Sequence, residues 1–393
     1  MKALLNGIRI VDVTTIVMGP MASQTLADLG AEVVKIEAPD GDLARHSGAP
    51  GPDGMGALFA NNNRNKKSLA LDLRRPAGRA VLTKLIAGAD VVMHNMRPKA
   101  AERLGLGPAA ARAANPAVIH CAAVGFGSGG PYAGTAAYDD VIQAAAGLAA
   151  LPLKVGRAPD YVPSIAADKI AALHVVYAIL AALMRRERTG EGCDIEVPMF
   201  EVLAAFLFNE HLDAATFAAD GAPGYSRLLN PNRRPYATKD GWIAAMPYSG
   251  GQWTRTLAEL GRGEVADEAW FATAAGRNAN SHTLYGILAA ALPARTTDEW
   301  IEVFHRLDVP HARVNTLEDL VADPHLAAVD FFRPTDGLAG RLRSVAQPVA
   351  FAGLADAPDR APPALGADAD EILAGLGYAA DEIAALRADR ALA

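Results

Sequence analysis

The chain has 393 residues, of which 51% are hydrophobic and 21% are charged, and its formal net charge at pH 7 is −7. This composition indicates a well-cored protein that is long enough for more than one domain, and it excludes an intrinsically disordered chain. The negative net charge argues against a nucleic-acid-binding protein and against attraction to an anionic membrane.

Cysteine content and the apolar runs bear on the compartment. The only two cysteines, Cys121 and Cys193, cannot form a disulfide framework, which favours a reducing compartment. The N-terminal residues show neither the long apolar core nor the small-residue cleavage site of a secretory signal. The longest apolar run, 170–184, is too short for a membrane span of about 20 residues and indicates a buried helix. We expect a cytoplasmic protein without a membrane partner.

Strands and helices alternate through the first 200 residues. Buried strands are predicted at 7–13, 31–37, 68–73, 90–95 and 117–126, and helices at 19–30, 76–89, 98–107 and in a long segment around Asp168. Pro20 and Pro76 stand in the first turns of two of these helices, where proline is favoured. Such alternation indicates βαβ units and a mostly parallel sheet with both faces covered, which binds ligands at the carboxyl ends of its strands.

The pattern changes after residue 200. A hairpin with a Lys-Asp-Gly turn is predicted over 236–246, and helices follow at 249–261, 283–294 and 296–308. In the tail we predict a strand over 340–351, then a Pro-rich stretch over 357–366, and then two helices within 367–389. The predicted fold class is therefore α/β, with a doubly wound, mostly parallel sheet and a smaller α+β domain.

The predicted domain boundaries follow from these patterns. A large Rossmann-like domain comprises residues 1–200 and the returning C-terminal part, 346–393, and the small domain spans 225–325. Linkers are predicted at 201–224 and 326–345.

Glycines after one predicted strand resemble a dinucleotide-binding motif. Gly125, Gly127 and Gly130 have the G-x-G-x-x-G spacing. In that motif a helix begins at the glycines and its N-terminus meets the pyrophosphate, whereas here Pro131 and a loop-like segment follow. A dinucleotide-dependent oxidoreductase is thus only weakly indicated.

Histidines and basic residues give two further observations. His94, His120 and His174 lie in apolar runs without ligand spacing, so we predict no metal site. Any single basic residue is best interpreted as part of a solvated face, but a cluster near the ends of parallel strands is suited to a polyphosphate. The cluster comprises Arg64, Lys66, Lys67, Arg74, Arg75, Arg97, Lys99 and Arg103.

Asp168 stands just ahead of the long apolar helix. Aspartate is a preferred N-cap residue, because its carboxylate accepts hydrogen bonds from the first turn, and the helix dipole favours its anion. From this segment alone, Asp168 is interpreted as a cap. A nucleophilic carboxylate must also stay ionised, so capping and covalent catalysis are compatible roles.

Six segments, taken in order, resemble the class III CoA-transferases, the family of the formyl-CoA:oxalate and carnitine CoA-transferases. They are residues 7–45, 61–73, 90–107, 115–147, 166–201 and 311–326. The resemblance implies an enzyme that moves CoA from an acyl-CoA donor to a carboxylic acid acceptor, with CoA as a substrate and no permanently bound cofactor. It also implies an interlocked homodimer, which the predicted linkers would accommodate.

The resemblance assigns roles to individual residues. Asp168 corresponds to the family's nucleophile, which would attack the acyl-CoA thioester, form a mixed anhydride and then carry CoA as an aspartyl-CoA thioester. The family's CoA contacts correspond to Val17, Met18, Leu71, Arg74, Asn95, Met96, Arg97, Arg103 and Tyr138.

Three positions depart from the family pattern. Family members often have arginine where Ala38 stands, and the formyl-CoA enzyme has lysine where Ala136 stands, so these two CoA contacts are in doubt. The glycine-rich loop of that enzyme has only a partial counterpart at 250–252, which by position is better explained as a helix N-terminus.

Two alternatives stay open beside CoA transfer. A sister branch of the superfamily racemises 2-methylacyl-CoA esters with a His–Asp pair, and has histidine where Tyr138 stands. An unperturbed tyrosine is a poor base at neutral pH compared with histidine, which favours the transferase. The second alternative is a CoA-binding protein that has lost catalysis, which the presence of Asp168 opposes.

Overall fold

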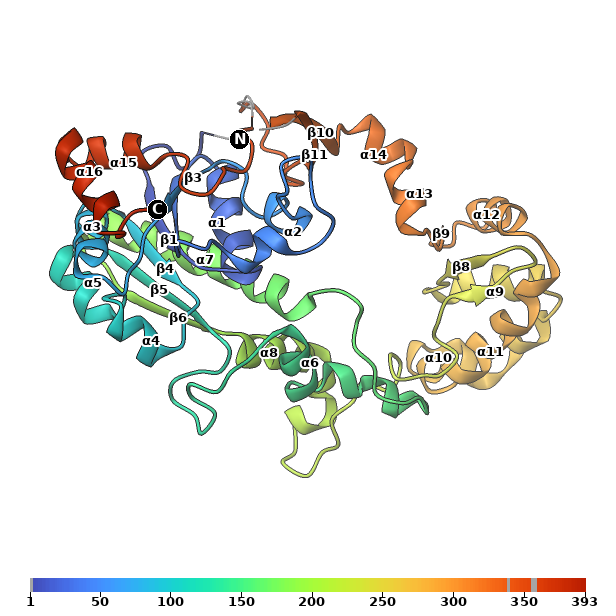
Figure 1. Cartoon of the computed structure of the whole chain (residues 1–393). Coiled ribbons are helices and arrows are strands. Elements are labelled where there is room, and N and C mark those ends of the chain that lie inside the picture. The colour runs from blue at the N-terminus through green and yellow to red at the C-terminus, as the bar shows by residue number, and fades with distance from the viewer. Residues whose placement is uncertain (1–2, 338–339, 355–358) are drawn as a thin grey trace. The chain divides into compact units, whose positions relative to one another are not determined.

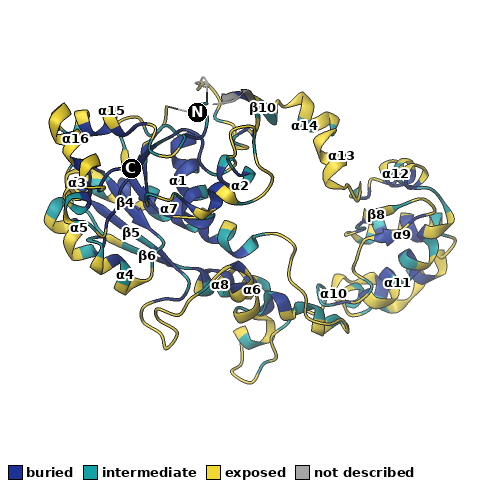
Figure 2. Cartoon of the chain, viewed as in Figure 1, coloured by how far each residue is buried: buried dark blue, intermediate teal, exposed yellow. Residues whose placement is uncertain are grey.

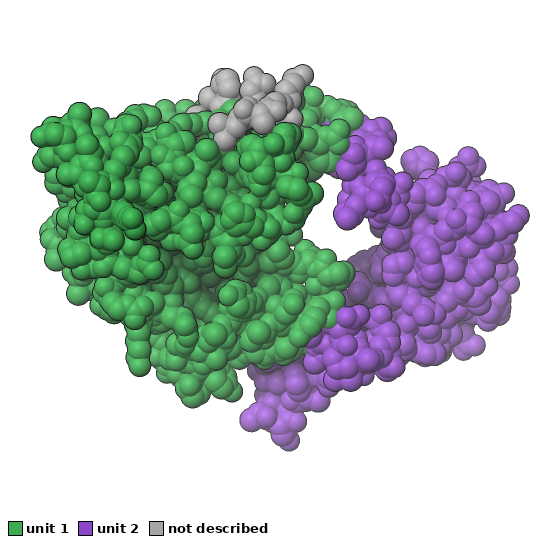
Figure 3. All heavy atoms as spheres, in the orientation of Figure 1, with its two compact units in different colours: residues 1–148, 161–206, 327–393 green, residues 149–160, 207–326 purple. Residues whose placement is uncertain are grey.

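The computed structural model describes residues 3–337, 340–354 and 359–393. The chain divides into two compact units (Figure 3). Unit 1 comprises residues 1–148, 161–206 and 327–393, and unit 2 comprises residues 149–160 and 207–326.

Unit 1 is built on a six-stranded parallel sheet with the strand order β3-β2-β1-β4-β5-β6 (Figure 1). Its strands are β1 (Arg9–Val13), β2 (Glu32–Glu37), β3 (Lys66–Ala70), β4 (Val91–His94), β5 (Ile119–Val124) and β6 (Asp194–Pro198). This is the order of the doubly wound dinucleotide-binding sheet, in which the winding reverses between β1 and β4. The predicted α/β fold with a parallel sheet is confirmed.

Helices cover both faces of this sheet because its strands are apolar on both sides. Along β1, Ile10 belongs to the core cluster under α1 (Met18–Asp28) and α7 (Ala166–Thr189), and Val11 to the cluster on the opposite face. Figure 2 shows the strands buried between these layers. The opposite cluster is covered by α3 (Pro76–Ala87), α4 (Pro98–Arg103), α5 (Pro108–Ala114), α15 (Ala369–Gly375) and α16 (Ala380–Ala388).

The C-terminal segment returns to β3. The Ala393 N–H donates to the Ala70 carbonyl at 3.2 Å, and the Ser68 N–H donates to the Asp368 carboxylate at 2.8 Å. The end of the chain therefore completes the edge of the sheet where β3 lies.

Helix α7 is the longest helix of the described residues. It is long and apolar enough, by length and composition alone, to cross a membrane. Ala171, Val175 and Ile179 on one of its faces are fully buried in the core cluster with α1, which agrees with the prediction of a core helix. The other face leaves Leu173 and Tyr177 more than half exposed.

Unit 2 is a smaller α+β structure. The predicted hairpin over 236–246 is present: β7 (Tyr236–Ala237) and β8 (Trp242–Ala245) are antiparallel, and β9 (His311–Arg313) completes a three-stranded sheet. Its core holds Trp253, Phe271, Trp300 and other buried side chains. Its helices are α9 (Gly250–Glu259), α10 (Ala274–Ala279), α11 (Ser281–Ala291), α12 (Thr297–Arg306) and α13 (Leu317–Val321).

The segments predicted as linkers carry regular structure. Residues 201–224 hold most of α8 (Met199–His211), because the apolar pattern that follows β6 continues as a helix. Residues 326–345 hold the end of α14 (Pro324–Ala328) and a hairpin of β10 (Phe332–Gly337) and β11 (Gly340–Val345). Residues 338–339 of this linker and 357–358 of the Pro-rich stretch lie outside the described residues.

The remaining elements are short. They are η1 (Leu43–His46), α2 (Ala57–Ala60), α6 (Asp139–Ala145), η2 (Leu148–Val155), η3 (Asp213–Thr216), η4 (Gly263–Asp267), η5 (Ala269–Ala272) and η6 (Leu292–Ala294), where η denotes a 3₁₀ helix. Residues 149–160, which include most of η2, belong to unit 2 although they interrupt unit 1 in the sequence.

Candidate active site

The crevice between the ends of β1 and β4 is the ligand site that this sheet order predicts. The loop after β1 and the loop after β4 meet there. The Asn95 side chain joins them, because its Oδ1 accepts the Thr15 N–H at 3.0 Å and its Nδ2 donates to the Thr15 carbonyl at 2.8 Å. Asn95 thus holds the β1 loop in register with the β4 loop.

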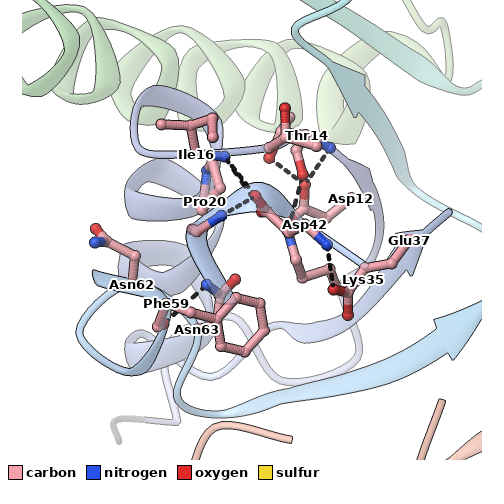
Figure 4. A network of polar contacts seen from close by, with 12 residues as sticks. Asp12, Thr14, Ile16, Pro20, Lys35, Glu37, Asp42, Phe59, Asn62 and Asn63 are labelled. Atoms are coloured by element: carbon pink, nitrogen blue, oxygen red, sulfur yellow. Dashed lines mark hydrogen bonds and ion pairs between the residues drawn. The ribbon is translucent and has the colours of Figure 1, made fainter. Parts of the chain in front are cut away.

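The β1 loop has a strained conformation that buried charges stabilise. Ile16 has φ 71°, a left-handed conformation that is unfavourable for a β-branched residue. The Asp42 carboxylate accepts the Ile16 N–H at 3.1 Å, and Lys35 Nζ donates to the Thr14 carbonyl at 2.8 Å and to Asp42 at 3.0 Å (Figure 4). The side chains of Lys35 and Asp42 are both fully buried, and their ion pair stabilises the strained conformation of this loop.

A second buried pair lies beneath the same loop. Asp12 accepts hydrogen bonds from Ser23 and Thr14, and Lys66 Nζ lies 3.2 Å from its Oδ2. Burial opposes ionisation of Asp12, but the charges of Lys66 and Lys35 lower its pKa to about 2. Burial lowers the pKa of Lys66 to about 8, although Asp12 partly offsets this.

Part of the predicted basic cluster is therefore structural. Lys66 is fully buried against Asp12, and Arg64 is buried against Asp28. The expectation that these two residues belong to a phosphate-binding surface is wrong, because their charges are used inside the core.

A pocket of about 450 Å³ opens beside this loop, at the carboxyl ends of β1, β2 and β3. Three of the predicted CoA-binding residues line it: Leu71, Arg74 and Met96. Ala38 also lines it and brings no cation. Arg74 is mostly exposed, and its Nε lies 2.8 Å from the Asp72 carboxylate, which is itself part of the wall.

The other predicted CoA-binding residues lie around this edge in different ways. The side chains of Val17 and Met18 are buried in the core, so these residues have only backbone groups to offer a ligand. Val17 is the N-cap residue of α1, whose first turn has no acidic residue and no capping side chain. The free backbone N–H groups of this helix end therefore have no competing side chain, a common arrangement for binding phosphate.

Arg97, Arg103 and Tyr138 are exposed. Arg97 precedes α4 and Arg103 ends it, and within the described ranges neither guanidinium is paired with a carboxylate. Tyr138 is 71% exposed and stands at the N-cap position of α6. These three side chains are therefore free to contact a ligand.

Asp168 is the third residue of α7, not its cap. The N-cap position is Ile165, and no side chain caps this helix end. No donor within residues 3–337, 340–354 and 359–393 forms a hydrogen bond with the half-buried Asp168 carboxylate. The interpretation of Asp168 as a cap is wrong, because the helix begins three residues earlier than the cap would require.

Two residues that the sequence reasoning missed hold Asp168 in place. The Asp139 carboxylate accepts the Asp168 N–H at 3.0 Å with one oxygen and the Gln143 amide at 2.6 Å with the other. Gln143, fully buried, also accepts the Val162 N–H at 3.0 Å and so fixes the segment that enters α7. The spacing of Asp139 and Gln143, four residues apart on a helix, was the available signal.

The environment of Asp168 raises its pKa. Burial and the negative charge of Asp139 raise the pKa of Asp168 to about 7. The helix N-terminus favours the anion, but it does not outweigh these two effects. Asp168 is thus an unpaired carboxyl that changes charge near neutral pH, as groups at reactive sites often do.

The glycine motif and the histidines have structural roles. No helix begins at Gly125, Gly127 or Gly130, since α6 starts only at Asp139, as the sequence reasoning expected. The Gly127 N–H donates to Glu201 at 3.0 Å. His94 and His120 are buried with ring centroids 5.2 Å apart, and burial and His120 lower the pKa of His94 to about 4.

The strand order defines a doubly wound α/β protein, a class that binds its ligands at the switch point of the sheet. The chain belongs to CoA-transferase family III, whose sequence model matches residues 5–369. It is therefore an enzyme, a CoA-transferase, and the resemblance seen in the sequence is confirmed.

Relatives and solved structures agree with this membership. The chain is 32% identical over 339 residues to the succinate–glutarate CoA-transferase of Agrobacterium fabrum, covering 83% of this chain and 84% of that protein. It is 30% identical over 376 residues to a probable fatty acyl-CoA transferase of Mycobacterium tuberculosis, covering 92% and 95%. A crystal structure of a CAIB/BAIF family protein from Brucella suis superposes with a TM-score of 0.81 at 30% identity, covering 96% of this chain and all of that one.

Proposed function

We propose that the enzyme transfers CoA from an acyl-CoA donor to a carboxylic acid through an aspartyl-CoA thioester on Asp168. The observation that carries this proposal is the unpaired Asp168 carboxylate, which Asp139 holds by the backbone and leaves free at its side chain. A carboxylate without hydrogen-bond donors is poorly solvated and retains its nucleophilicity.

The proposed chemistry begins with attack on the donor. The ionised Asp168 oxygen adds to the thioester carbonyl, the C–S bond breaks, and CoA leaves as a thiolate from a mixed anhydride. The thiolate then attacks the aspartyl carbonyl, the C–O bond breaks, and the donor acid leaves as a carboxylate while CoA stays on Asp168 as a thioester. The acceptor carboxylate repeats the two steps in reverse order and leaves as the new acyl-CoA. No proton is consumed overall and the thioester energy is conserved.

We propose that CoA binds along the carboxyl edge of the sheet. The supporting features are the open N-terminus of α1 at Val17 and Met18, and the pocket lined by Leu71, Arg74 and Met96. Asn95 contributes by fixing the β1 loop. The unpaired guanidinium groups of Arg97 and Arg103 are suited to binding phosphates. Exposed Tyr138 immediately precedes α6, the helix whose Asp139 accepts the Asp168 N–H.

The experiment is to trap the intermediate. The protein is incubated with a panel of acyl-CoA donors, quenched with hydroxylamine or borohydride, and the peptide that contains Asp168 is weighed by mass spectrometry. The names of the relatives suggest fatty acyl, formyl and dicarboxylic acyl groups for the panel. A modified Asp168 is expected with at least one donor. Solvent deuterium entering the α-carbon of a 2-methylacyl-CoA, with Asp168 unmodified, would instead establish the racemase.

We also propose that the enzyme is an interlocked homodimer. The exposed face of α7 supports association with another chain, since Leu173, Tyr177 and Met184 are each more than half exposed and lie on one side of the helix. Light scattering on the purified protein tests the mass. A Tyr177→Glu variant should form monomers if this face is the interface, and a dimer that tolerates it would place the interface elsewhere.

A further inference from the structure

Unit 2 contains a small cavity of about 70 Å³ that the proposed chemistry does not use. Its lining residues come in part from the N-terminal part of α9 and from α10 and α11. Its polar walls come from Arg227, Arg277, Tyr248, Tyr285, Asn278 and Ser281. All of these residues belong to unit 2, so the cavity is a feature of that unit alone.

Both arginines are held by neighbouring groups. Arg227 Nε donates to the Tyr285 hydroxyl at 3.2 Å, and its guanidinium lies 4.6 Å from the centre of the Tyr248 ring. Arg277 Nη1 donates to the Phe271 carbonyl at 2.7 Å. The Arg277 guanidinium also lies against Gly250, where a Cβ atom would be 3.2 Å from Nη1. The two side chains are therefore oriented before any ligand binds.

The cavity has positive charge without a counter-charge. Neither Arg227 nor Arg277 forms an ion pair within the described part of the chain, and no carboxylate lines the cavity. By contrast, Arg295 and Arg306 of the same unit share Glu259. The N-terminus of α9 adds the positive end of the helix dipole to this cavity, and the first turn of the helix contains no acidic residue.

Two half-buried guanidinium groups around one small space repel each other unless an anion lies between them. Arginine stays protonated in proteins, so this repulsion is not relieved by loss of a proton. A guanidinium presents parallel N–H donors that match the two oxygens of a carboxylate. The Ser281 hydroxyl, which accepts a hydrogen bond from Asn230 at 3.2 Å, keeps its own proton for an incoming oxygen.

We propose that this cavity is a carboxylate-binding site of unit 2, which takes small organic acids between Arg227 and Arg277. The ligand belongs to the chemical class that the proposed function names as acceptor. All groups of the site lie in unit 2, whereas Asp168 belongs to unit 1.

Protection of the arginines in the full-length protein tests the site. Phenylglyoxal modifies accessible arginines, and peptide mass spectrometry gives the rate at each position. Succinate or glutarate is expected to slow modification of Arg227 and Arg277, and to leave Arg262, which is exposed and paired with Glu264, unchanged. Equal rates with and without the acids at Arg227 and Arg277 would overturn the proposal, and so would stronger protection by inorganic phosphate at the same ionic strength.

Variants give a second measurement. Arg227→Gln and Arg277→Gln should each weaken succinate binding by about tenfold or more in calorimetry, whereas Arg262→Gln should not. Arg277→Lys keeps the positive charge but loses the parallel N–H donors of the guanidinium, so its affinity for succinate should lie between those of wild type and Arg277→Gln. Asp168→Asn should retain the protection of Arg227 and Arg277, so loss of the CoA-transfer mechanism and loss of this site are distinguishable.

Discussion

Two groups of carboxylates in unit 1 have opposite surroundings. Asp12 and Asp42, below the β1 loop, each face a buried lysine, and the pKa of Asp12 falls to about 2. Asp168, in the first turn of α7, has a carboxylate that forms no ion pair and accepts no hydrogen bond within the described residues, and its pKa rises to about 7. Burial raises the pKa of a carboxyl where nothing compensates it. Asp12 and Asp42 therefore stabilise the fold, whereas the unpaired Asp168 carboxylate remains available to react.

The largest effect is expected from Asp168→Asn. The amide keeps the size of the side chain but is not a nucleophile, so the rate of CoA transfer should fall by about 10⁴-fold or more. Acyl-CoA binding, measured by calorimetry, should persist. The matched control is Asp140→Asn, an exposed aspartate in the first turn of α6, which should retain near wild-type kcat. Comparable losses of the CoA-transfer rate in Asp168→Asn and Asp140→Asn would contradict a special role for Asp168.

The opposite substitution removes a paired carboxylate. Asp42→Asn leaves the buried Lys35 ammonium without its partner, so the free energy of unfolding should fall by about 3–5 kcal/mol. Because Asp42 also holds Ile16, the KM for acyl-CoA should rise.

Glu32→Gln is the control for this substitution. It breaks a partly exposed pair between Glu32 of β2, the strand that also carries Lys35, and Lys67 of β3, and it should cost at most about 1 kcal/mol. Chemical denaturation measures both variants. Equal losses of stability would mean that burial does not set the importance of these pairs.

A substitution at the close contact between Gly19 and the β1 loop tests the loop without changing charge. A Cβ on Gly19 would lie 2.2 Å from the Thr14 Cβ, so Gly19→Ala should displace the loop at a cost of about 1–3 kcal/mol and weaken CoA binding. Gly129→Ala, at an exposed glycine with open space around it, should change neither property. Normal CoA affinity in Gly19→Ala would show that the loop geometry does not matter for binding.

The smallest effect concerns stability against pH. The folded-state pKa of Asp168 lies above its ordinary value of 3.8, so the folded state binds more protons than the unfolded state, and stability falls as pH rises from about 4 to 7. Asp168→Asn lacks this loss and should be more stable than wild type by roughly 1–2 kcal/mol above pH 7, allowing for partial exposure. The two proteins should converge near pH 4. A constant difference across this range would indicate that Asp168 has an ordinary pKa.

Sequence patterns predicted the parallel sheet and the main helices because buried strands and amphipathic helices have distinct periods. They also indicated Asp168 through a family resemblance. They misplaced the helix boundary by assigning Asp168 to the cap, since Ile165, an unusual N-cap residue, begins α7 without a side-chain hydrogen bond.

What the sequence did not reveal depends on contacts between distant segments. Lys66 looks like a surface lysine in the sequence, yet it pairs with Asp12, 54 positions away, inside the core. Asp139 holds Asp168 across 29 positions. The predicted linker at 201–224 contains most of α8 because the residues after β6 remain apolar, and composition alone does not distinguish a helical connection from an extended one.

The pH dependence of adduct formation tests the central claim most directly. Rapid quenching of the enzyme with a reactive acyl-CoA, followed by mass analysis of the Asp168 peptide, gives the single-turnover rate at each pH. The rate should rise with pH with a midpoint near 7, since the ionised Asp168 carboxylate is the nucleophile of the proposed mechanism. Asp139→Asn should move this midpoint to lower pH, because it removes the negative charge beside Asp168. A rate on Asp168 that is independent of pH between about 5 and 9, or a midpoint unchanged in Asp139→Asn, would contradict the account.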